Sequence, residues 1–219
     1  MTTDGIAGRV AEVRERIARA ARAAGRDPRS VRLVAATKTQ PVAAIAAVVA
    51  AGVRDVGENR AQELVAKAPA LETAGPEWHF IGRLQRNKLN QLAPWVRWWH
   101  SVDRLELVEA LAPRVPGARI LVEVNVAGEP QKGGADPAAV PALVDRARAL
   151  GLDVVGLMTV APAEGDPRPV FATLRGLGSH LGLTELSMGM SSDFEAAIAE
   201  GATLVRVGTA LFGPRPTFH

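Results

Sequence analysis

Residues 31–38, VRLVAATK, are the stretch of sequence that decides the fold. A short apolar run rich in β-branched residues predicts a buried β-strand, and this one ends at Lys38. The apolar residues of positions 41–51 come next, in a pattern typical of a buried helix. The core is therefore predicted to begin with a strand followed by a helix.

The same strand-helix unit recurs along the rest of the sequence. Further strands are predicted at 53–57, 78–82, 97–101, 119–126, 153–160, 184–188 and 203–208. Helical patterns follow them at 59–68, 84–92, 103–112, 137–149, 168–181 and 193–200, with a short turn near 209–212. Repeated units of this kind imply a parallel sheet of the α/β class, and eight of them can close into a (β/α)8 TIM barrel. An open doubly wound sheet is the alternative, although its dinucleotide-binding form needs a Gly-x-Gly-x-x-Gly after the first strand, which is absent.

An extra N-terminal helix is predicted ahead of the barrel, at about residues 5–24. Ile6, Val10, Val13 and Ile17 recur at three- and four-residue steps, and Gly25 ends the pattern. No long linker or internal repeat divides the sequence, so residues 1–219 are predicted to form a single domain.

Three of the predicted helices have capping signals at their starts. Asp103 with Glu106, and Ser192 with Glu195, have the spacing of a capping box. Asp136 precedes a proline, which suits a cap followed by a first-turn proline. These signals predict helices that begin directly after the capping residues.

Composition argues against several classes of protein. The 219 residues are 47% hydrophobic and 22% charged, which is ordinary for a globular protein with one core. The absence of cysteine removes disulfides, thiolate zinc sites and cysteine nucleophiles. A net charge of +3 with dispersed basic residues gives little support to nucleic-acid binding. The first residues lack the apolar core of a signal peptide, and the most apolar run, 41–53, is shorter than the about 20 residues of a membrane span. We therefore expect a cytoplasmic protein that does not enter a membrane.

Lys38 is the first candidate for chemistry, because the active site of a TIM barrel lies at the C-terminal ends of the strands. Lys38 shares strand parity with Val34 and Ala36, so its amine would lie at the barrel mouth if that face points inward. A lysine amine in this position can attack a carbonyl and form a Schiff base. A surface or salt-bridge role for Lys38 is the alternative.

The last two strands end in turns rich in glycine, serine and threonine, SMGMSSDF at 187–194 and RVGTALFG at 206–213. Turns at this place in a TIM barrel commonly bind phosphate. Gly189 and Gly208 let the backbone approach an anion closely, while Ser191 and Thr209 offer hydroxyl groups. The alternative is that Ser191 and Ser192 cap a helix, which would account fully for Ser192.

Arg206 is predicted to bring a permanent positive charge into the barrel mouth. It shares parity with Leu204 and Gly208 and has apolar neighbours on both sides. A buried guanidinium needs an acceptor, which would be a carboxylate or a nitrogen of a ligand.

Three other polar residues lie on or after predicted strands. Asn59 follows the second strand and either hydrogen-bonds a ring substituent of a ligand or caps a helix together with Gln62. His79 and His100 lie on the third and fourth strands, where a hydrogen-bonded core histidine is commoner than a catalytic one. Neither histidine is assigned a role in proton transfer.

A lysine at one side of the mouth and a phosphate cup at the other describe a site for a phosphorylated aldehyde. Pyridoxal 5'-phosphate meets this description, and so do the sugar phosphates on which Schiff-base aldolases act. The residues by themselves leave both ligands open.

Eight motifs, taken in order, narrow the choice of ligand. They are AATKTQP, GENRAQE, WHFIGRLQRNK, HSVDR, QKGG, GLMTV, SMGMSSDFEAAI and RVGTALFG, and together they cover most of the chain from residue 31 onward. In this order they resemble the motifs of the pyridoxal phosphate homeostasis proteins. The resemblance implies the fold of the alanine racemase N-terminal domain, with pyridoxal 5'-phosphate as the cofactor.

The resemblance also implies roles for individual residues. It makes Lys38 the Schiff-base lysine and places Ser191, Gly208 and Thr209 around the cofactor phosphate. By the same resemblance Asn59 and Met190 lie near the cofactor, and Arg206 faces the pyridine nitrogen. A fixed cation there disfavours protonation of the ring and weakens the cofactor as an electron sink.

The resemblance leaves a choice between carrier and enzyme. Alanine racemase-like enzymes use a tyrosine of a second domain as the opposing base, whereas this sequence has no tyrosine. General acid–base help of that kind is worth about 10²–10⁴-fold in rate. We therefore expect a protein that stores or delivers the cofactor in vitamin B6 homeostasis, without robust catalysis of its own. An amino-acid racemase-like enzyme and a Schiff-base aldolase acting on a sugar phosphate are the alternatives.

The resemblance also bears on the protein's partners and on its oligomeric state. A carrier would hand the cofactor to client enzymes that use pyridoxal 5'-phosphate. Because the racemase's second domain supplies much of its dimer surface and is absent here, we expect a monomer.

Overall fold

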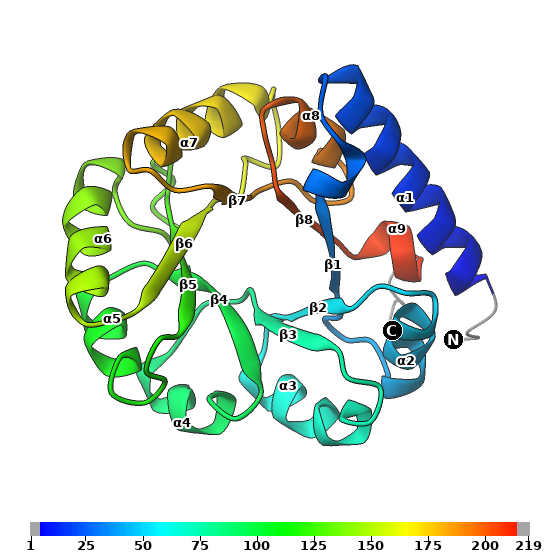
Figure 1. The fold of residues 1–219 in the computed structure, drawn as a ribbon, viewed down its shortest axis with the longest axis horizontal. Helices are drawn as coiled ribbons and strands as arrows, with labels where there is room; N and C mark the ends of the chain where they lie inside the picture. Colours follow the sequence, from blue (N-terminus) through cyan, green and yellow to red (C-terminus); the bar gives the residue numbers. More distant parts are fainter. Residues whose placement is uncertain (1–4, 214–219) are drawn as a thin grey trace.

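The fold is a closed parallel barrel in which strands and helices alternate (Figure 1). In the computed structural model, which describes residues 5–213, eight strands pair in sequence order and β8 pairs back to β1. The strands are β1 (Arg32–Ala36), β2 (Asp55–Glu58), β3 (Glu77–Phe80), β4 (Val96–Val102), β5 (Arg119–Glu123), β6 (Asp153–Met158), β7 (Glu185–Ser187) and β8 (Leu204–Val207). The predicted (β/α)8 barrel is confirmed, and the open doubly wound sheet is wrong.

The helices form a ring around the strands (Figure 1). They are α1 (Ile6–Ala23), α2 (Val42–Ala50), α3 (Ala61–Lys67), α4 (Leu89–Leu92), α5 (Leu105–Leu111), α6 (Val140–Ala149), α7 (Arg168–His180), α8 (Phe194–Ala199) and α9 (Thr209–Phe212). Short 3-10 helices lie at η1 (Pro28–Ser30), η2 (Pro69–Leu71), η3 (Arg86–Lys88) and η4 (Pro137–Ala139). The single helix predicted at 84–92 is thus divided into η3 and α4.

The extra helix α1 has the apolar face that its sequence pattern predicts. Ile6, Val10, Val13 and Ile17 are buried along it. The helix lies outside the barrel beside α8 and α9 (Figure 1). These two helices follow the last two strands, so α1 packs against helices that are far from it in the sequence.

Two of the predicted caps have different outcomes. Asp136 accepts a hydrogen bond from the backbone N–H of Ala138 at 2.8 Å, as predicted for a cap before a proline. Asp103 does not cap α5, because that helix begins after Arg104 without a side-chain cap. The Asp103 carboxylate instead accepts from the backbone N–H of Gly134 at 3.3 Å and pairs with Arg104, so a contact with the loop after the neighbouring strand β5 replaces the cap.

Apolar side chains fill two separate layers. The larger layer lies between the strands and the surrounding helices. The smaller one fills the barrel interior and consists of Val34, Trp98, Leu121, Met158 and Leu204. Val34 and Leu204 therefore face inward, as the parity arguments for Lys38 and Arg206 require.

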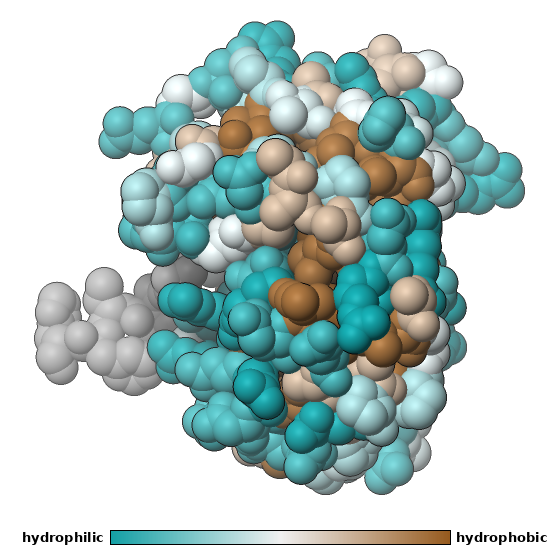
Figure 2. Space-filling view, turned by 90° about the vertical axis from the view of Figure 1, so that its left-hand side faces the viewer, coloured by the Kyte–Doolittle hydropathy of each residue, from teal (hydrophilic) through white to brown (hydrophobic). Residues whose placement is uncertain are grey.

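The face of the molecule seen in Figure 2 is mostly hydrophilic. Figure 2 views the side covered by α5 and α6 and shows apolar residues gathered in small clusters among polar ones. A shallow groove on these two helices is lined partly by Leu105 and Leu143, and Leu105 is 45% exposed. Among residues 5–213, none of the helices combines the length and apolar character that a membrane crossing requires.

Candidate functional site at the barrel mouth

A cavity of about 560 Å³ opens at the C-terminal ends of the strands. It brings together all seven residues that the sequence analysis assigned to cofactor binding, which are Lys38, Asn59, Met190, Ser191, Arg206, Gly208 and Thr209. They come from four separate strand ends, those of β1, β2, β7 and β8. Closure of the barrel is what makes β8 and β1 neighbours, so residues about 170 positions apart share one cavity.

Lys38 lies in a tight turn directly after β1. The next residue, Thr39, has a φ of 63°, which is uncommon for a residue with a side chain. Its backbone N–H donates to Glu63 Oε2 at 2.9 Å, and its hydroxyl donates to the Lys38 carbonyl oxygen at 2.6 Å. A left-handed residue costs on the order of 1 kcal/mol and persists only where its surroundings hold it. The backbone after Lys38 is therefore held in a fixed turn.

Lys67 binds residues on both sides of the same turn through its side-chain amine. Its Nζ donates to Glu58 Oε2 at 2.8 Å, to Glu63 Oε2 at 2.7 Å and to the Thr37 carbonyl oxygen at 3.1 Å. The Glu58 side chain is fully buried, and the Lys67 side chain is only 11% exposed. Sequence reasoning missed this cluster, and the only signal available was the i,i+4 spacing of Glu63 and Lys67 in the helix after the second strand.

Backbone N–H groups and hydroxyls meet at the ends of β7 and β8. Ser191 Oγ accepts from the backbone N–H groups of Gly208 and Ala210, at 3.2 Å and 3.4 Å. With both acceptor sites of the oxygen in use, its hydroxyl hydrogen is available to an acceptor in the cavity. Gly189 has a φ of +92°, and a Cβ there would lie 2.6 Å from the Ala197 Cβ, so only glycine fits this turn.

Two helix caps expected at the mouth are wrong. Ser192 does not cap α8, which begins after Asp193 without a side-chain cap, in spite of the capping-box spacing. Asn59 does not cap α3, which begins after Arg60. The Asn59 backbone N–H donates to Glu58 Oε1 at 2.9 Å. Both Ser192 and Asn59 line the mouth cavity instead.

Arg206 is almost completely buried at the floor of the cavity, with 5% of its surface exposed. It donates to Ser187 Oγ at 2.6 Å and to the Thr159 carbonyl oxygen at 2.9 Å. Burial lowers the pKa of Arg206 to about 10, although the negative charges of Glu123 and Asp193 oppose the shift. The guanidinium therefore stays protonated at neutral pH and brings a fixed positive charge to the cavity.

His79 and His100 are buried and hydrogen-bonded, as predicted for core histidines. Burial lowers the pKa of His79, and burial together with His79 and Arg206 lowers the pKa of His100 well below its usual range. Both rings are therefore neutral at pH 7.

The cavity also has lining residues that sequence reasoning missed. Gln40, Ile81 and Val160 each follow a strand, so the rule that selected Lys38 could also have selected them. Gln40 is 6% exposed, and its Oε1 has no hydrogen-bond partner among residues 5–213. A buried amide oxygen without a partner is uncommon, and one beside a cavity suits a ligand that brings a donor.

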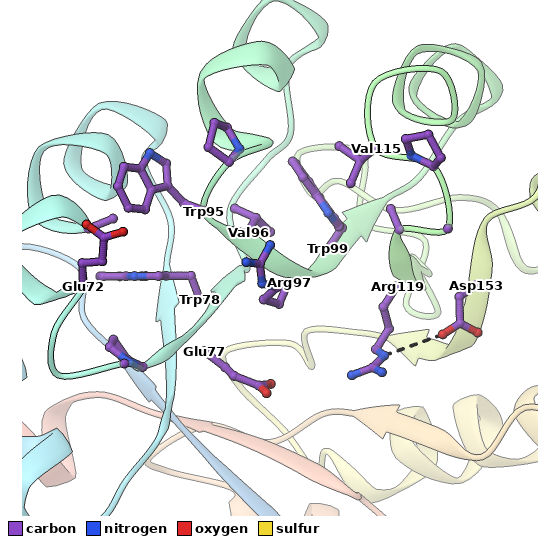
Figure 3. Close-up of a pocket in the computed structure, with 17 residues that line it drawn as sticks. Glu72, Glu77, Trp78, Trp95, Val96, Arg97, Trp99, Val115, Arg119 and Asp153 are labelled. Atoms are coloured by element: carbon purple, nitrogen blue, oxygen red, sulfur yellow. Dashed lines mark ion pairs between the residues drawn. The ribbon is translucent and has the colours of Figure 1, made fainter.

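A second cavity, of about 670 Å³, lies at the opposite end of the barrel (Figure 3). Trp78, Trp95 and Trp99 line it, and its rim includes the ion pair between Arg119 and Asp153, with 3.6 Å between Nε and Oδ2. It lies at the N-terminal ends of β3, β4 and β5, where conserved chemistry is not expected in this fold. The mouth cavity is therefore the stronger candidate site.

Three possible metal ligands meet near this lower end. Ligand atoms of Asp55, Glu77 and His79 lie within 4.8 Å of one another. A guanidinium nitrogen of Arg32 already lies 3.2 Å from the Asp55 carboxylate and 4.0 Å from that of Glu77. The arginine thus supplies the positive charge that these two carboxylates need.

Comparison with known proteins gives a consistent family. Residues 9–216 match the family model described as alanine racemase, N-terminal domain. The chain is 46% identical to the pyridoxal phosphate homeostasis protein of Pseudomonas aeruginosa over 220 residues, covering 96% of each sequence. It is 43% identical to the protein of the same name from Aquifex aeolicus, covering 94% of this chain and 97% of that one.

Solved structures agree with these matches. PipY of Synechococcus elongatus, solved with pyridoxal phosphate bound, is 38% identical, has a TM-score of 0.83 and is matched over 95% of this chain and 100% of its own. Alanine racemase of Corynebacterium glutamicum is 19% identical with a TM-score of 0.66, over 98% of this chain and 62% of its own. That second likeness shows a shared fold and nothing more.

Proposed function

This chain belongs to the pyridoxal phosphate homeostasis protein family, and on that premise we propose that it binds pyridoxal 5'-phosphate in the mouth cavity. We further propose that it stores or delivers the cofactor within the cytoplasm, without robust catalysis of its own. The observation that carries the proposal is the meeting of a lysine amine and a cup of hydroxyl and backbone N–H groups in one cavity.

The groups that line the cavity suit this cofactor. Lys38 supplies the amine that would hold the cofactor's aldehyde as a Schiff base. The hydroxyls of Ser191 and Thr209, with the backbone at Gly208, suit the three acceptor oxygens of a phosphate. Gln40 adds a buried oxygen without a partner, which suits a donor on the ligand.

The remaining lining residues would orient the cofactor ring. Asn59 and Met190 also line the cavity, and the resemblance to the family implies that both lie near the cofactor. Arg206 would face the pyridine nitrogen, where its charge disfavours ring protonation. When bound, the cofactor supplies a reactive aldehyde, and the protein's part is to hold it reversibly and away from other amines.

A carrier fits the composition better than a racemase does. The sequence contains no tyrosine, so the opposing base of alanine racemase-like enzymes has no counterpart of that residue type. Transfer to client enzymes that use pyridoxal 5'-phosphate would then proceed by exchange with a free amine or with a lysine of the client enzyme. We propose a monomer as the acting form.

Borohydride reduction tests the covalent part of this proposal. The purified protein loaded with pyridoxal 5'-phosphate should show a visible absorption band that bleaches on reduction, and peptide mass mapping should find the label on Lys38. The chain has only four lysines, Lys38, Lys67, Lys88 and Lys132, so the assignment is unambiguous.

Substitution of the lysine completes the test. Lys38→Ala should abolish the reduced adduct, whereas the matched control Lys88→Ala, in η3, should retain it. Full labelling of Lys38→Ala would show that another amine holds the cofactor. A colourless protein that cannot be loaded at all would refute cofactor binding itself and would favour a sugar-phosphate ligand.

A further inference from the structure

A hydrogen-bonded series of five side chains runs through the barrel interior. His79 Nε2 lies 3.0 Å from Asp55 Oδ1, and His79 Nδ1 lies 2.9 Å from His100 Nε2. His100 Nδ1 lies 2.9 Å from Ser187 Oγ, to which Arg206 donates at 2.6 Å. We call these five residues the core relay.

The core relay joins the two ends of the barrel. Asp55 is the first residue of β2 and lines a pocket at the N-terminal ends of the strands. Arg206 lines the mouth cavity at the opposite ends. His79, His100 and Ser187 between them are completely buried, so water does not interrupt the series. The indole of Trp98 stacks on His79, with 5.3 Å between ring centroids and 5° between planes, and shields it from the side.

The two ends of the core relay fix the direction of every hydrogen bond in it. A guanidinium can only donate, so Ser187 Oγ accepts from Arg206 and gives its own hydrogen to His100 Nδ1. His100 then carries its hydrogen on Nε2 and donates to His79 Nδ1. His79 in turn carries its hydrogen on Nε2 and donates to Asp55, which as a carboxylate can only accept.

The charges around the relay agree with this direction. Burial would raise the pKa of Asp55, but the hydrogen bond from His79 and the charge of Arg32 bring it below its usual range. The groups that face His79 are Asp55, Arg32 and Glu77. Burial, aided by the positive charge of Arg32, outweighs the two carboxylates, lowers the pKa of His79 and keeps its ring neutral. Two neutral rings between an arginine and a carboxylate leave one arrangement of hydrogens that satisfies all four contacts.

We propose that Asp55, His79, His100 and Ser187 are positioning residues for the cofactor site, which act by holding Arg206 in one orientation with its remaining N–H groups directed into the mouth cavity. This inference rests on the proposed function, because Arg206 is the member of the relay that would meet the cofactor ring. It assigns a role to four residues, in the barrel interior and at its N-terminal end, that do not line the mouth cavity. A carboxylate at position 55 can only accept, whereas an amide there can also donate to His79, so Asp55→Asn no longer fixes the two histidine tautomers. The last contact to loosen is the one between Ser187 and Arg206.

Imidazole 15N spectra of the protein without cofactor test the relay directly. At pH 7 both His79 and His100 should be neutral and protonated on Nε2. The variant Asp55→Asn should shift the ring signals of His100, although the Asp55 side chain does not contact that ring. The matched control Glu77→Gln removes a carboxylate at the same end of the barrel, outside the relay, and should leave His100 unchanged.

Cofactor binding provides the second readout. Ser187→Ala removes the acceptor of a charged donor and should raise the dissociation constant for pyridoxal 5'-phosphate about tenfold or more. Asp55→Asn should raise it about threefold to fivefold, and both variants should shift the visible absorption band of the loaded protein. Glu77→Gln should change neither quantity.

The two readouts separate the inference from the proposed function. Two outcomes would overturn the positioning role while cofactor binding stands. One is a His100 ring that is charged or protonated on Nδ1. The other is that Asp55→Asn, Glu77→Gln and the unchanged protein give equal spectra and equal dissociation constants. An unchanged protein that fails to bind pyridoxal 5'-phosphate would refute the proposed function, and the role of the relay at that site with it.

Discussion

Replacing Lys67 by methionine removes the cation that the buried Glu58 needs. Lys67 is the only lysine or arginine that pairs with Glu58 among residues 5–213, and the Glu58 side chain has no exposed surface. Methionine keeps a similar stem, so the change deletes the charge with little loss of packing. We expect the variant to fold with markedly lower stability, because it leaves a buried carboxylate without its partner.

The hydrogen bonds that remain set the size of the effect. Breaking a buried ion pair from one side costs about 3–5 kcal/mol. Glu58 would keep the hydroxyl of Thr37 at 3.0 Å and the backbone N–H of Asn59 at 2.9 Å, so we expect the lower end, about 3 kcal/mol. For a chain of 219 residues this corresponds to a fall in Tm of about 6–12 °C.

Thermal and urea unfolding of the protein without cofactor measure this loss. The double variant Glu58→Gln/Lys67→Met removes both charges and should lose less stability than Lys67→Met alone. Lys88→Met, a change outside the cluster, should stay within about 0.5 kcal/mol of the unchanged protein. A loss below about 1 kcal/mol for Lys67→Met, or a double variant less stable than the single one, would refute the reasoning.

Three further changes have expected outcomes. Burial and the negative charge of Asp103 raise the pKa of Glu123 to about 7, so the folded state holds that proton more tightly than the unfolded state, and its stability falls by about 2–3 kcal/mol as pH rises from 5 to 8. Glu123→Gln should flatten this dependence in urea midpoints measured across that range, and an unchanged slope would contradict the assignment. Gly82→Ala would place a Cβ 2.0 Å from the Asn59 carbonyl oxygen, and we expect a loss of about 3 kcal/mol or more in thermal unfolding together with weaker cofactor loading. Gly189→Ala would put a Cβ 2.9 Å from the Phe194 Cα at a positive φ, so the phosphate cup should be disturbed, and phosphate should protect this variant less well than the unchanged protein in a melting assay.

Much of the barrel could be predicted from the sequence because its signals are local. Apolar runs of strand length alternate with helical patterns, and every predicted strand is present within three residues of its expected bounds. The candidate site could be predicted for the same reason, since the residues that end the strands of a barrel meet at its mouth whatever the loops between them. Lys38 was selected by its place at a strand end together with its parity, and Arg206 by its parity and its apolar neighbours. Both line the cavity.

Prediction from the sequence failed where a contact with a distant residue replaces a local one. Asp103 has the spacing of a cap, but its carboxylate accepts from the backbone N–H of Gly134 in the loop after β5, and no local sequence pattern indicates that contact. The core relay could not be predicted either. His79 and His100 were predicted to be hydrogen-bonded core residues, whereas their contact with each other depends on the stagger of β3 against β4, in which His79 pairs with Trp98.

The position of α1 has a consequence for the order of events on the ribosome. Arg9 donates to the carbonyl oxygen of Leu211 at 2.6 Å, and Arg16 pairs with Glu195 at 2.6 Å, so the first helix to be synthesised has its partners near the end of the chain. At about 5–20 residues per second, translation would leave the apolar face of α1 without those partners for roughly ten seconds or more. The phosphate cup is formed by residues of the same late segments, so neither the partners of α1 nor the cup is complete before those segments are synthesised. A nascent chain stopped before β8 should therefore expose α1 to proteases and hold no cofactor.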